Sequence, residues 1–437
     1  MTGPHLLYVA FGFPPSRAGG VYRALATVNA FVEAGWEVTV LTVPRDTFVT
    51  GIGADVGLEA RIDPRVVVER VPFDAPQRVS DLADWSRFRA RQPELWTVLD
   101  RVRDIRRFPE PAYGRWRPAL EAAADRVHAA KPVDLVIGTA NPHVDFVVGP
   151  HLATRHAVPY VMDYRDAWAL DVFSGREIHA DRSRAGRVER RMIDGAHEVW
   201  FVNEPIRAWH ERRFPESAAK MHVVANGYDE YDAPLRVPVR PARGEGLRFG
   251  YVGTLTDQVP LAETIAGWRQ ARRRGAVRSE DRLVIHGYLG HFSDRSRAAL
   301  ALESVVPEDG IEFAGAVPKA TIGEVYAGFD ALVLILGTGE YVTSGKIFEY
   351  LATGIPVMSA HDPGNAASDV LAGSAAWVPA RGLETDALAD AFAAVARMAS
   401  SQTPDGRAAA QHWAARFERR AQLAPRIAAL RAHVEAP

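Results

Sequence analysis

Cysteine is absent from the 437 residues of this chain, and lysine is rare. Without cysteine there are no disulfide bonds and no thiolate chemistry, and a reducing compartment is compatible with the sequence. No apolar run reaches the roughly 18 residues of a membrane-spanning helix. The first residues, Met-Thr-Gly-Pro-His, contain neither the basic segment nor the cleavage site of a signal peptide. We therefore expect a cytoplasmic protein.

The chain also lacks a strong excess of charge of either sign, because its formal net charge is −2. Nothing in this balance favours nucleic acid as a partner. Metal-binding motifs, a nucleophile elbow and internal repeats are missing as well, so we expect no metal and no organic cofactor. What remains is the composition of an ordinary globular protein, with a length that predicts two or three domains.

The segment Gly337–Val357, GTGEYVTSGKIFEYLATGIPV, is the most informative part of the chain. It follows an apolar run, 331–336, that is short enough to be a buried strand. Lys346–Ala352 has the pattern of a helix, which Gly354 ends. The start of such a helix offers free backbone N–H groups and a positive dipole end, which favour phosphate. The residues expected to hold phosphate there are Thr343, Ser344 and Gly345.

Lys346 supports this interpretation because lysine is otherwise scarce. The chain has 48 arginines and four lysines, at positions 131, 220, 319 and 346. A compact ammonium can approach a phosphate oxygen where a planar guanidinium does not fit. Glu349, one turn further along, could accept hydrogen bonds from ribose hydroxyls. The pattern predicts a nucleoside-diphosphate site, and the alternative is a solvated loop lysine.

This segment resembles the donor-binding signature of retaining glycosyltransferases of family 4, which have the GT-B architecture. In the second half of their pattern, E-A-x-A-x-G-x-P-V, the glutamate matches Glu349 and the closing A-x-G-x-P-V matches Ala352–Val357. The first glutamate of the pattern, which contacts the transferred sugar in the family, falls on Tyr341. A subgroup that reads S-x-K-x-x-E-Y-L-A fits Ser344–Ala352 better, and the chain is identified as a member of that divergent branch.

The N-terminal half has a Rossmann-like pattern of its own. A strand at Leu6–Ala10 precedes a glycine-bearing loop, a helix over Val21–Ala34 and a second strand at Glu37–Val43. Glycines at a strand-to-helix junction let the backbone approach a ligand, although a tight turn is the simpler explanation. Similar loops in related glycosyltransferases imply that Gly19 and Gly20 lie near the donor phosphates or the acceptor. Further acceptor contacts are predicted at Arg17, Tyr22, Arg23, Asn141 and Tyr341.

Two polar clusters follow the presumed strands Val133–Ile137 and Val158–Met162. Parallel sheets bind ligands at such carboxyl ends. The clusters resemble the (S/N)-P-x-H and D-x-R-D-x-W segments of the same subgroup. A loop-fixing ion-pair network and a helix cap are the structural alternatives. The residues predicted to be catalytic are His143, Arg165, Asp166 and Lys346.

The C-terminal half begins after a linker at 230–246 that is rich in proline, glycine and charge. A strand at Arg248–Val252 leads into Gly253–Thr256, where typical family members carry an arginine in place of Thr254. The hydroxyls of Thr254 and Thr256 are therefore predicted to contact donor phosphate. Val317 lies on the loop that meets the nucleobase in the family.

The resemblance implies an α/β protein of GT-B fold, with two Rossmann-like domains whose parallel sheets face across a cleft. We predict an N-terminal domain at 1–229, a nucleotide-sugar domain at 247–400, and C-terminal helices at 401–437 that cross back to the first domain. A helical insertion at about 81–130 contains, over 81–118, nine arginines and six acidic residues. It is interpreted as an amphipathic pair packed on the sheet, an acceptor lid or a membrane edge. We do not expect membrane contact, because the excess of three positive charges is small.

The predicted activity is that of a hexosyltransferase. It would move a sugar from a nucleoside-diphosphate sugar to a small-molecule or saccharide acceptor with retention of configuration. UDP or GDP is the expected nucleoside diphosphate of the donor. Secondary metabolism or cell-envelope synthesis is the expected context. Two alternatives stay open: a sugar-nucleotide epimerase or hydrolase, and a non-catalytic nucleotide-binding protein. The oligomeric state is not encoded in any pattern.

Overall fold

A computed structural model describes residues 3–49, 53–76, 79, 81–229, 235, 237, 239, 246–287, 296–318, 321–337 and 339–436. The chain divides into two compact units. The first unit comprises Met1–Asp171, Arg176–Ala225 and Gln422–Pro437. The second unit comprises Val172–Gly175 and Asn226–Ala421. Most of the predicted linker, 230–246, lies outside the described residues.

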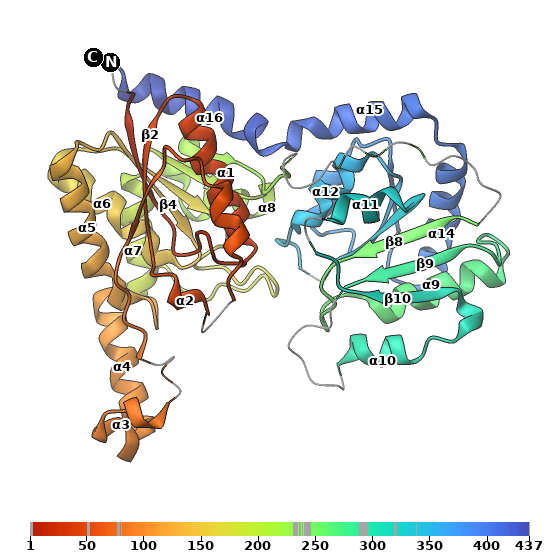
Figure 1. The fold of residues 1–437 in the computed structure, drawn as a ribbon, viewed down its shortest axis with the longest axis horizontal. Helices are drawn as coiled ribbons and strands as arrows, with labels where there is room; N and C mark the ends of the chain where they lie inside the picture. Colours follow the sequence, from red (N-terminus) through yellow and green to blue (C-terminus); the bar gives the residue numbers. More distant parts are fainter. Residues whose placement is uncertain are drawn as a thin grey trace. The chain divides into compact units, whose positions relative to one another are not determined.

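The first unit is built on a parallel sheet of seven strands in the order β3-β2-β1-β4-β5-β6-β7 (Figure 1). The chain reverses its direction of growth between β1 and β4, which defines a topological switch point. The strands are β1 (His5–Val9), β2 (Glu37–Thr42), β3 (Val67–Arg70), β4 (Leu135–Ala140), β5 (Tyr160–Tyr164), β6 (Glu198–Phe201) and β7 (Met221–Val223).

The second unit has a parallel sheet of six strands in the order β10-β9-β8-β11-β12-β13. Its switch point lies between β8 and β11, which pair through Ala331 and Phe249. The strands are β8 (Arg248–Val252), β9 (Arg282–His286), β10 (Ile311–Gly315), β11 (Ala331–Ile335), β12 (Val357–Ala360) and β13 (Trp377–Pro379).

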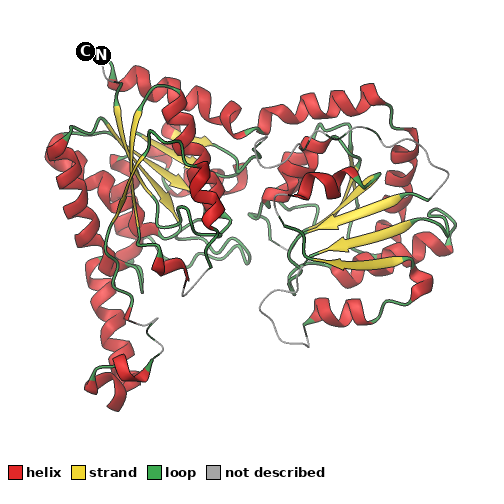
Figure 2. Cartoon of the chain, viewed as in Figure 1, coloured by secondary structure: helices red, strands yellow, loops and turns green. Residues whose placement is uncertain are grey.

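Helices lie on both sides of each sheet (Figure 2), so the central strands are buried on both faces and read as continuous apolar runs. The helices before the second sheet are α1 (Gly20–Glu33), α2 (Asp46–Val49), α3 (Arg87–Arg91), α4 (Pro93–Arg107), α5 (Arg117–Ala130), α6 (Val148–His156), α7 (Arg184–Gly195) and α8 (Glu204–Arg213). Those after it begins are α9 (Leu261–Arg273), α10 (Arg297–Glu303), α11 (Ile322–Ala327), α12 (Gly345–Thr353), α13 (Ala367–Leu371), α14 (Thr385–Ser401), α15 (Pro404–Ala414) and α16 (Arg419–Val434).

Each unit has its own apolar core. In the first, Leu423, Ile427 and Leu430 of α16 pack with β1 and α1. In the second, Trp268 of α9 and Phe392 of α14 pack against β8. The last turns of the chain thus complete the core of the first unit.

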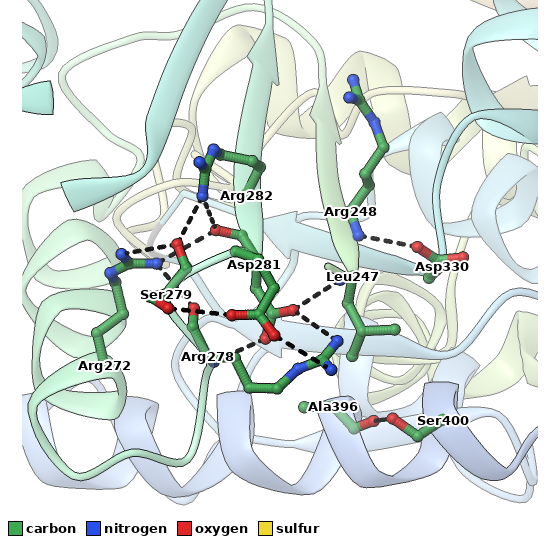
Figure 3. Close-up of polar contacts among 11 residues, drawn as sticks. Leu247, Arg248, Arg272, Arg278, Ser279, Asp281, Arg282, Asp330, Ala396 and Ser400 are labelled. Atoms are coloured by element: carbon green, nitrogen blue, oxygen red, sulfur yellow. Dashed lines mark hydrogen bonds and ion pairs between the residues drawn. The ribbon is translucent and has the colours of Figure 1, made fainter. Parts of the chain in front are cut away.

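Two carboxylates close the amino ends of three neighbouring strands in the second sheet (Figure 3). Asp281, which is 1% exposed, accepts hydrogen bonds from the backbone N–H of Leu247 at 2.6 Å and of Arg278 at 2.8 Å. Asp330 accepts one from the N–H of Arg248 at 2.8 Å. These contacts fix the amino ends of the strands, and parallel sheets of this kind bind ligands at the opposite, carboxyl ends.

Two Rossmann-like units confirm the predicted fold class. Strand and helix limits differ from the expected ones by at most three residues. The limits of β8 are those predicted, whereas β4 starts at Leu135 and ends at Ala140. The predicted C-terminal helices, 401–437, are divided, because residues up to Ala421 belong to the second unit and those from Gln422 to the first.

Candidate functional site

Lys346 lies at the switch point of the second unit and is held there by a tyrosine. Its Nζ donates a hydrogen bond to Tyr251 Oη at 2.9 Å and lies 4.7 Å from the centre of the Tyr251 ring. Tyr251 Oη in turn donates to the carbonyl oxygen of Thr254 at 3.0 Å. The loop after β8 and the first turn of α12 are therefore joined through one phenol.

Burial lowers the pKa of Lys346 to about 8, while the Glu349 carboxylate acts in the opposite direction. The low pKa means that the ammonium is poorly solvated where it stands. An incoming anion would supply the missing solvation. This is the electrostatic setting expected of a phosphate-binding lysine.

The first turn of α12 has the geometry of a helix N-terminus open to a ligand. Ser344 is the N-cap, and its Oγ accepts from the backbone N–H of Lys346 at 3.4 Å. A Cβ built on Gly345 would meet no atom within 4 Å among the described residues. The space beside Gly345 is therefore open to at least one further atom, and a helix N-terminus of this kind favours an anion.

Glu349 and Tyr350 fix α12 to the rest of the second unit. Glu349 Oε2 accepts a hydrogen bond from Tyr326 Oη at 3.1 Å. Tyr350 Oη accepts one from the backbone N–H of Val252 at 2.8 Å. The helix that carries Lys346 is thus tied directly to the end of β8.

Gly253 is required by the approach of Lys346. A Cβ at this position would overlap the end of the Lys346 side chain. The glycine therefore admits the lysine between the two switch-point loops.

Four further residues predicted for the donor side lie on loops of the same unit: Thr254, Thr256, Val317 and Thr343. Thr254 and Thr256 are on the loop that contacts Lys346 through Tyr251, and Thr343 precedes the cap of α12. Val317 is half-buried on the loop after β10, two strands away from β8. Tyr341, which was predicted as an acceptor contact, also lies in the second unit and is 7% exposed, so most of its side chain faces the protein.

At the switch point of the first unit the structure has a pocket of about 170 Å³. Three of the predicted residues line it: Gly20, Asn141 and Arg165. Tyr113, from the segment between α4 and α5, also lines it and was missed by the sequence analysis. The pocket lies at the carboxyl ends of β1 and β4, as the topology rule predicts.

Arg165 lies across the start of α1. A Cβ on Gly20 would overlap its guanidinium, so the glycine makes room for that side chain. Arg165 Nε and Nη2 both donate to Asp166 Oδ2. The side chains of Arg165 and Asp166 remain 29% and 38% exposed, so both are accessible.

His143 is held by a carboxylate from the helical insertion. Its Nδ1 lies 3.2 Å from Glu110 Oε1, and its Nε2 lies 3.3 Å from the carbonyl oxygen of Asp166. The ring also stacks on Trp168, with ring centres 5.2 Å apart. Burial would lower the pKa of His143, but the hydrogen bond and charge of Glu110 outweigh it, so the pKa is raised.

Glu110 and Asp145 position the loops around the pocket. The Glu110 carboxylate accepts from the backbone N–H groups of His143 at 3.0 Å and Val144 at 2.8 Å. Asp145 Oδ2 accepts from the N–H of Phe11 at 2.7 Å. Burial raises the pKa of Asp145 well above its usual value, against the effect of the Phe11 hydrogen bond.

Arg23 has a structural environment that differs from the acceptor contact expected of it. It is 4% exposed and pairs with the buried Asp163, with Nη2 2.6 Å from Oδ1. Its Nη1 donates to the carbonyl oxygens of Val224 and Ala225 at 2.8 and 3.1 Å. These contacts join α1 to β5 and to the residues after β7.

The remaining first-unit predictions lie outside the residues that line the pocket. Arg17 is exposed, and its guanidinium lies beside Gly53. Gly19 is exposed at the N-cap of α1, and Tyr22 is half-buried one turn later. Their predicted ligand contacts stay predictions.

Sequence reasoning missed Tyr251, Glu110 and Asp145. Tyr251 stands in a strand of apolar residues, where a tyrosine is read as core. Glu110 is 33 positions before His143 in the chain, in an insertion without a motif. Asp145, two residues after His143, offered one signal: an acidic residue within an apolar run, VDFVVG, which is seldom buried without a partner.

Within the described residues, no three His, Asp or Glu side chains are grouped so that they could hold a metal ion. The expectation that the activity needs no metal stays a prediction.

The fold is shared with solved glycosyltransferases. A glycosyltransferase from Rickettsia africae is similar with a TM-score of 0.66 and 11% identity, covering 100% of both chains. A sucrose-phosphate synthase from Thermosynechococcus elongatus has a TM-score of 0.59 and 16% identity, covering 99% of this chain and 100% of that one. HepE of Anabaena, solved with UDP and glucose, has a TM-score of 0.57 and 14% identity, covering 97% and 98%. The two Rossmann-like units therefore have the GT-B fold.

Sequence comparison identifies a known domain family in the N-terminal part of the chain. Residues 18–227, just short of half of the chain, match the family of the glycosyl transferase 4-like domain. No curated protein sequence is significantly similar to the chain. Together, the domain match and the GT-B fold support a glycosyltransferase.

Proposed function

We propose that this protein is a glycosyltransferase that moves a sugar from a nucleoside-diphosphate sugar to a small-molecule or saccharide acceptor. The observation that carries the proposal is the setting of Lys346. The half-buried Lys346, whose ammonium has a pKa lowered to about 8, stands at the N-terminus of α12 and is joined through Tyr251 to the Thr254 loop. Few ligands other than a phosphate or diphosphate satisfy such an arrangement.

The donor side follows from that assignment. Lys346 and the N–H groups of Ser344 and Gly345 stabilise the charge that develops on the departing diphosphate. Glu349 accepts hydrogen bonds from the ribose. A UDP carrier is favoured, in line with HepE, whose structure contains UDP and glucose.

The acceptor side is assigned to the switch-point pocket of the first unit. Arg165 and Asn141 line that pocket, and His143 is adjacent to it through the Asp166 carbonyl. We infer that these residues orient the acceptor hydroxyl, with Asp166 as a proton acceptor. Transfer of a hexose with retention of configuration, in secondary metabolism or envelope synthesis, completes the proposal.

Thermal unfolding with nucleotides tests the donor site. UDP, GDP, ADP and TDP, each with and without their common sugars, are added to the wild type, to Lys346→Ala and to Lys220→Ala. A nucleotide that binds only the folded protein raises the midpoint. We expect a rise with UDP or GDP that Lys346→Ala abolishes and that Lys220→Ala, a change in the first unit, retains.

Product analysis separates glycosyl transfer from its alternatives. Transfer yields a nucleoside diphosphate and a new glycoside only when acceptor is present. An altered or hydrolysed donor in the absence of acceptor would instead identify an epimerase or hydrolase. Equal midpoint shifts in the wild type and in Lys346→Ala would contradict the donor-site assignment.

A further inference from the structure

Helix α4 carries an apolar stripe that faces solvent. Four of its residues recur at the spacing of one helical face and are 39–58% exposed: Leu95, Val98, Leu99 and Val102. Figure 1 shows α3 and α4 extending away from the sheet of the first unit. An ordinary surface helix turns such a stripe toward the core, so this stripe is oriented in the opposite sense.

The orientation is fixed by buried ion pairs on the other face of α4. Asp100 and Asp104, 3% and 0% exposed in their side chains, pair with Arg115 at 2.6 and 2.7 Å. The backbone N–H of Ala112 also donates to Asp104 at 3.0 Å. Since breaking a buried pair is costly, α4 cannot roll to bury its apolar stripe.

The exposed surface around the stripe is strongly basic. Asp100 and Asp104 are neutralised in the interior, and Arg89 is held over the rings of Trp85 and Trp96. Among residues 87–107 this leaves Glu94 as the one exposed acidic side chain. The exposed arginines of the same segment are Arg87, Arg91, Arg101, Arg103, Arg106 and Arg107.

A second copy of the chain fits this surface poorly. A stable interface buries about 800 Å² on each partner, far more than one face of a 15-residue helix offers. Twofold pairing of α4 would also bring the arginines of both copies together with few carboxylates to balance them. At about 22 Å the helix is shorter than a bilayer core. Among the described residues, no helix has the length and apolarity to span a membrane.

We propose that α4 docks this protein on an anionic lipid surface. The helix lies in the plane of the interface, with its apolar stripe among the acyl chains and its arginines at the lipid phosphates. From the sequence we expect no membrane contact, because residues 81–118 carry an excess of only three positive charges. The exposed charged side chains of residues 87–107, in contrast, are those of six arginines and one glutamate. The proposal does not depend on the activity assigned above.

Vesicle sedimentation tests the proposal with a matched pair of variants. Val98→Glu places a charge in the stripe, and Thr97→Glu places the same charge on an exposed position of another face. Binding is measured to vesicles of phosphatidylcholine alone and with 30% phosphatidylglycerol. We expect binding to the anionic vesicles only, a loss of at least tenfold in Val98→Glu and a change below twofold in Thr97→Glu. Circular dichroism and the thermal midpoint establish that both variants fold.

A second variant tests the electrostatic part. Arg101→Gln combined with Arg106→Gln should weaken binding to the anionic vesicles, as should a higher salt concentration. The proposal is overturned if the protein binds neither vesicle, or binds both equally. It is also overturned if Val98→Glu and Thr97→Glu bind alike, or if sedimentation without lipid shows a dimer that Val98→Glu dissociates.

Discussion

At the scale of single residues, the most informative contact is that of Lys346, because its hydrogen-bond partner, Tyr251, is neutral. Tyr251 accepts a hydrogen bond from the ammonium at 2.9 Å and leaves its positive charge uncompensated. A carboxylate at the same distance would accept the hydrogen bond and also neutralise the charge. The lysine is thus positioned and remains able to attract an anion. Tyr251 is a positioning residue in this arrangement, since it acts on a ligand through Lys346.

The pKa of Lys346, lowered to about 8, predicts how nucleotide affinity depends on pH. Below pH 8 most of the lysine is charged, and above pH 8 the charge is progressively lost. We expect the affinity for UDP to fall about eightfold between pH 7.5 and 9 if binding requires the ammonium. Isothermal titration calorimetry over this range measures the change. Lys346→Ala should bind weakly and without this dependence, and an equal slope in that variant would contradict the prediction.

Gly20 and Gly19 form a matched pair at the start of α1. A Cβ on Gly20 overlaps the Arg165 guanidinium, a flexible group, whereas one on Gly19 meets no described atom within 4 Å. We therefore expect Gly20→Ala to fold but to displace Arg165 from the pocket. Once an acceptor is known, its kcat/KM should fall at least tenfold in Gly20→Ala and less than twofold in Gly19→Ala. Similar losses of kcat/KM in the two variants would show that the position of Arg165 does not affect acceptor binding.

At the scale of secondary-structure elements, both candidate sites follow from strand order. At the switch point of the first sheet the strands β1 and β4 are neighbours, and the chain continues from them toward opposite edges of the sheet. The same holds for β8 and β11 in the second sheet. The loops that follow these strands are brought side by side, although they are distant in the chain. Pocket-lining Gly20 and Asn141, for example, are separated by 121 positions, the difference between their numbers.

The sequence was sufficient for α12 and for the central strands β1, β2, β4, β5, β8 and β11, whereas β3, β6, β7 and β13 were not predicted. Apolar runs and glycine stops mark these elements directly, as at Ala331–Ile335 and Gly354. The partners of the site residues could not be predicted. Arg23 pairs with Asp163 across 140 positions, and a buried ion pair leaves no periodic pattern in a single sequence. The same holds for Glu110, which acts on His143 from an insertion.

The two carboxylates at the amino ends of β8, β9 and β11 predict a local stability effect. Asp281→Ala removes the acceptor of two backbone N–H groups, those of Leu247 and Arg278. Leaving such groups unpaired should lower the free energy of unfolding of the second unit by about 3 kcal/mol. Urea unfolding measures the loss. Glu280→Ala, at the neighbouring exposed position, should change little, and equal effects of both substitutions would contradict the role of Asp281.

At the scale of the whole molecule, the chain leaves the first unit and returns to it. Asn226–Ala421 belongs to the second unit, and Gln422–Pro437 to the first. Ile427, 4% exposed, lies in the core of the first unit with residues such as Leu6 and Val28. The C-terminal helix is therefore a structural part of a domain whose other residues end at Ala225.

This division predicts that the two units respond separately to mutation and to ligand. Ile427→Ala opens a cavity in the first unit and should destabilise it by about 3 kcal/mol. UDP binds at Lys346 in the second unit and, at 100 times its Kd, should stabilise that unit by about 2.7 kcal/mol. Because each unit has its own core, differential scanning calorimetry should show two transitions. We expect Ile427→Ala to lower one midpoint and UDP to raise the other, while Glu435→Ala, which removes an exposed ion pair with Arg431, shifts neither. A single transition moved by both the mutation and the nucleotide would show that the units unfold together. If UDP instead raised the same transition that Ile427→Ala lowers, the nucleotide would bind in the first unit.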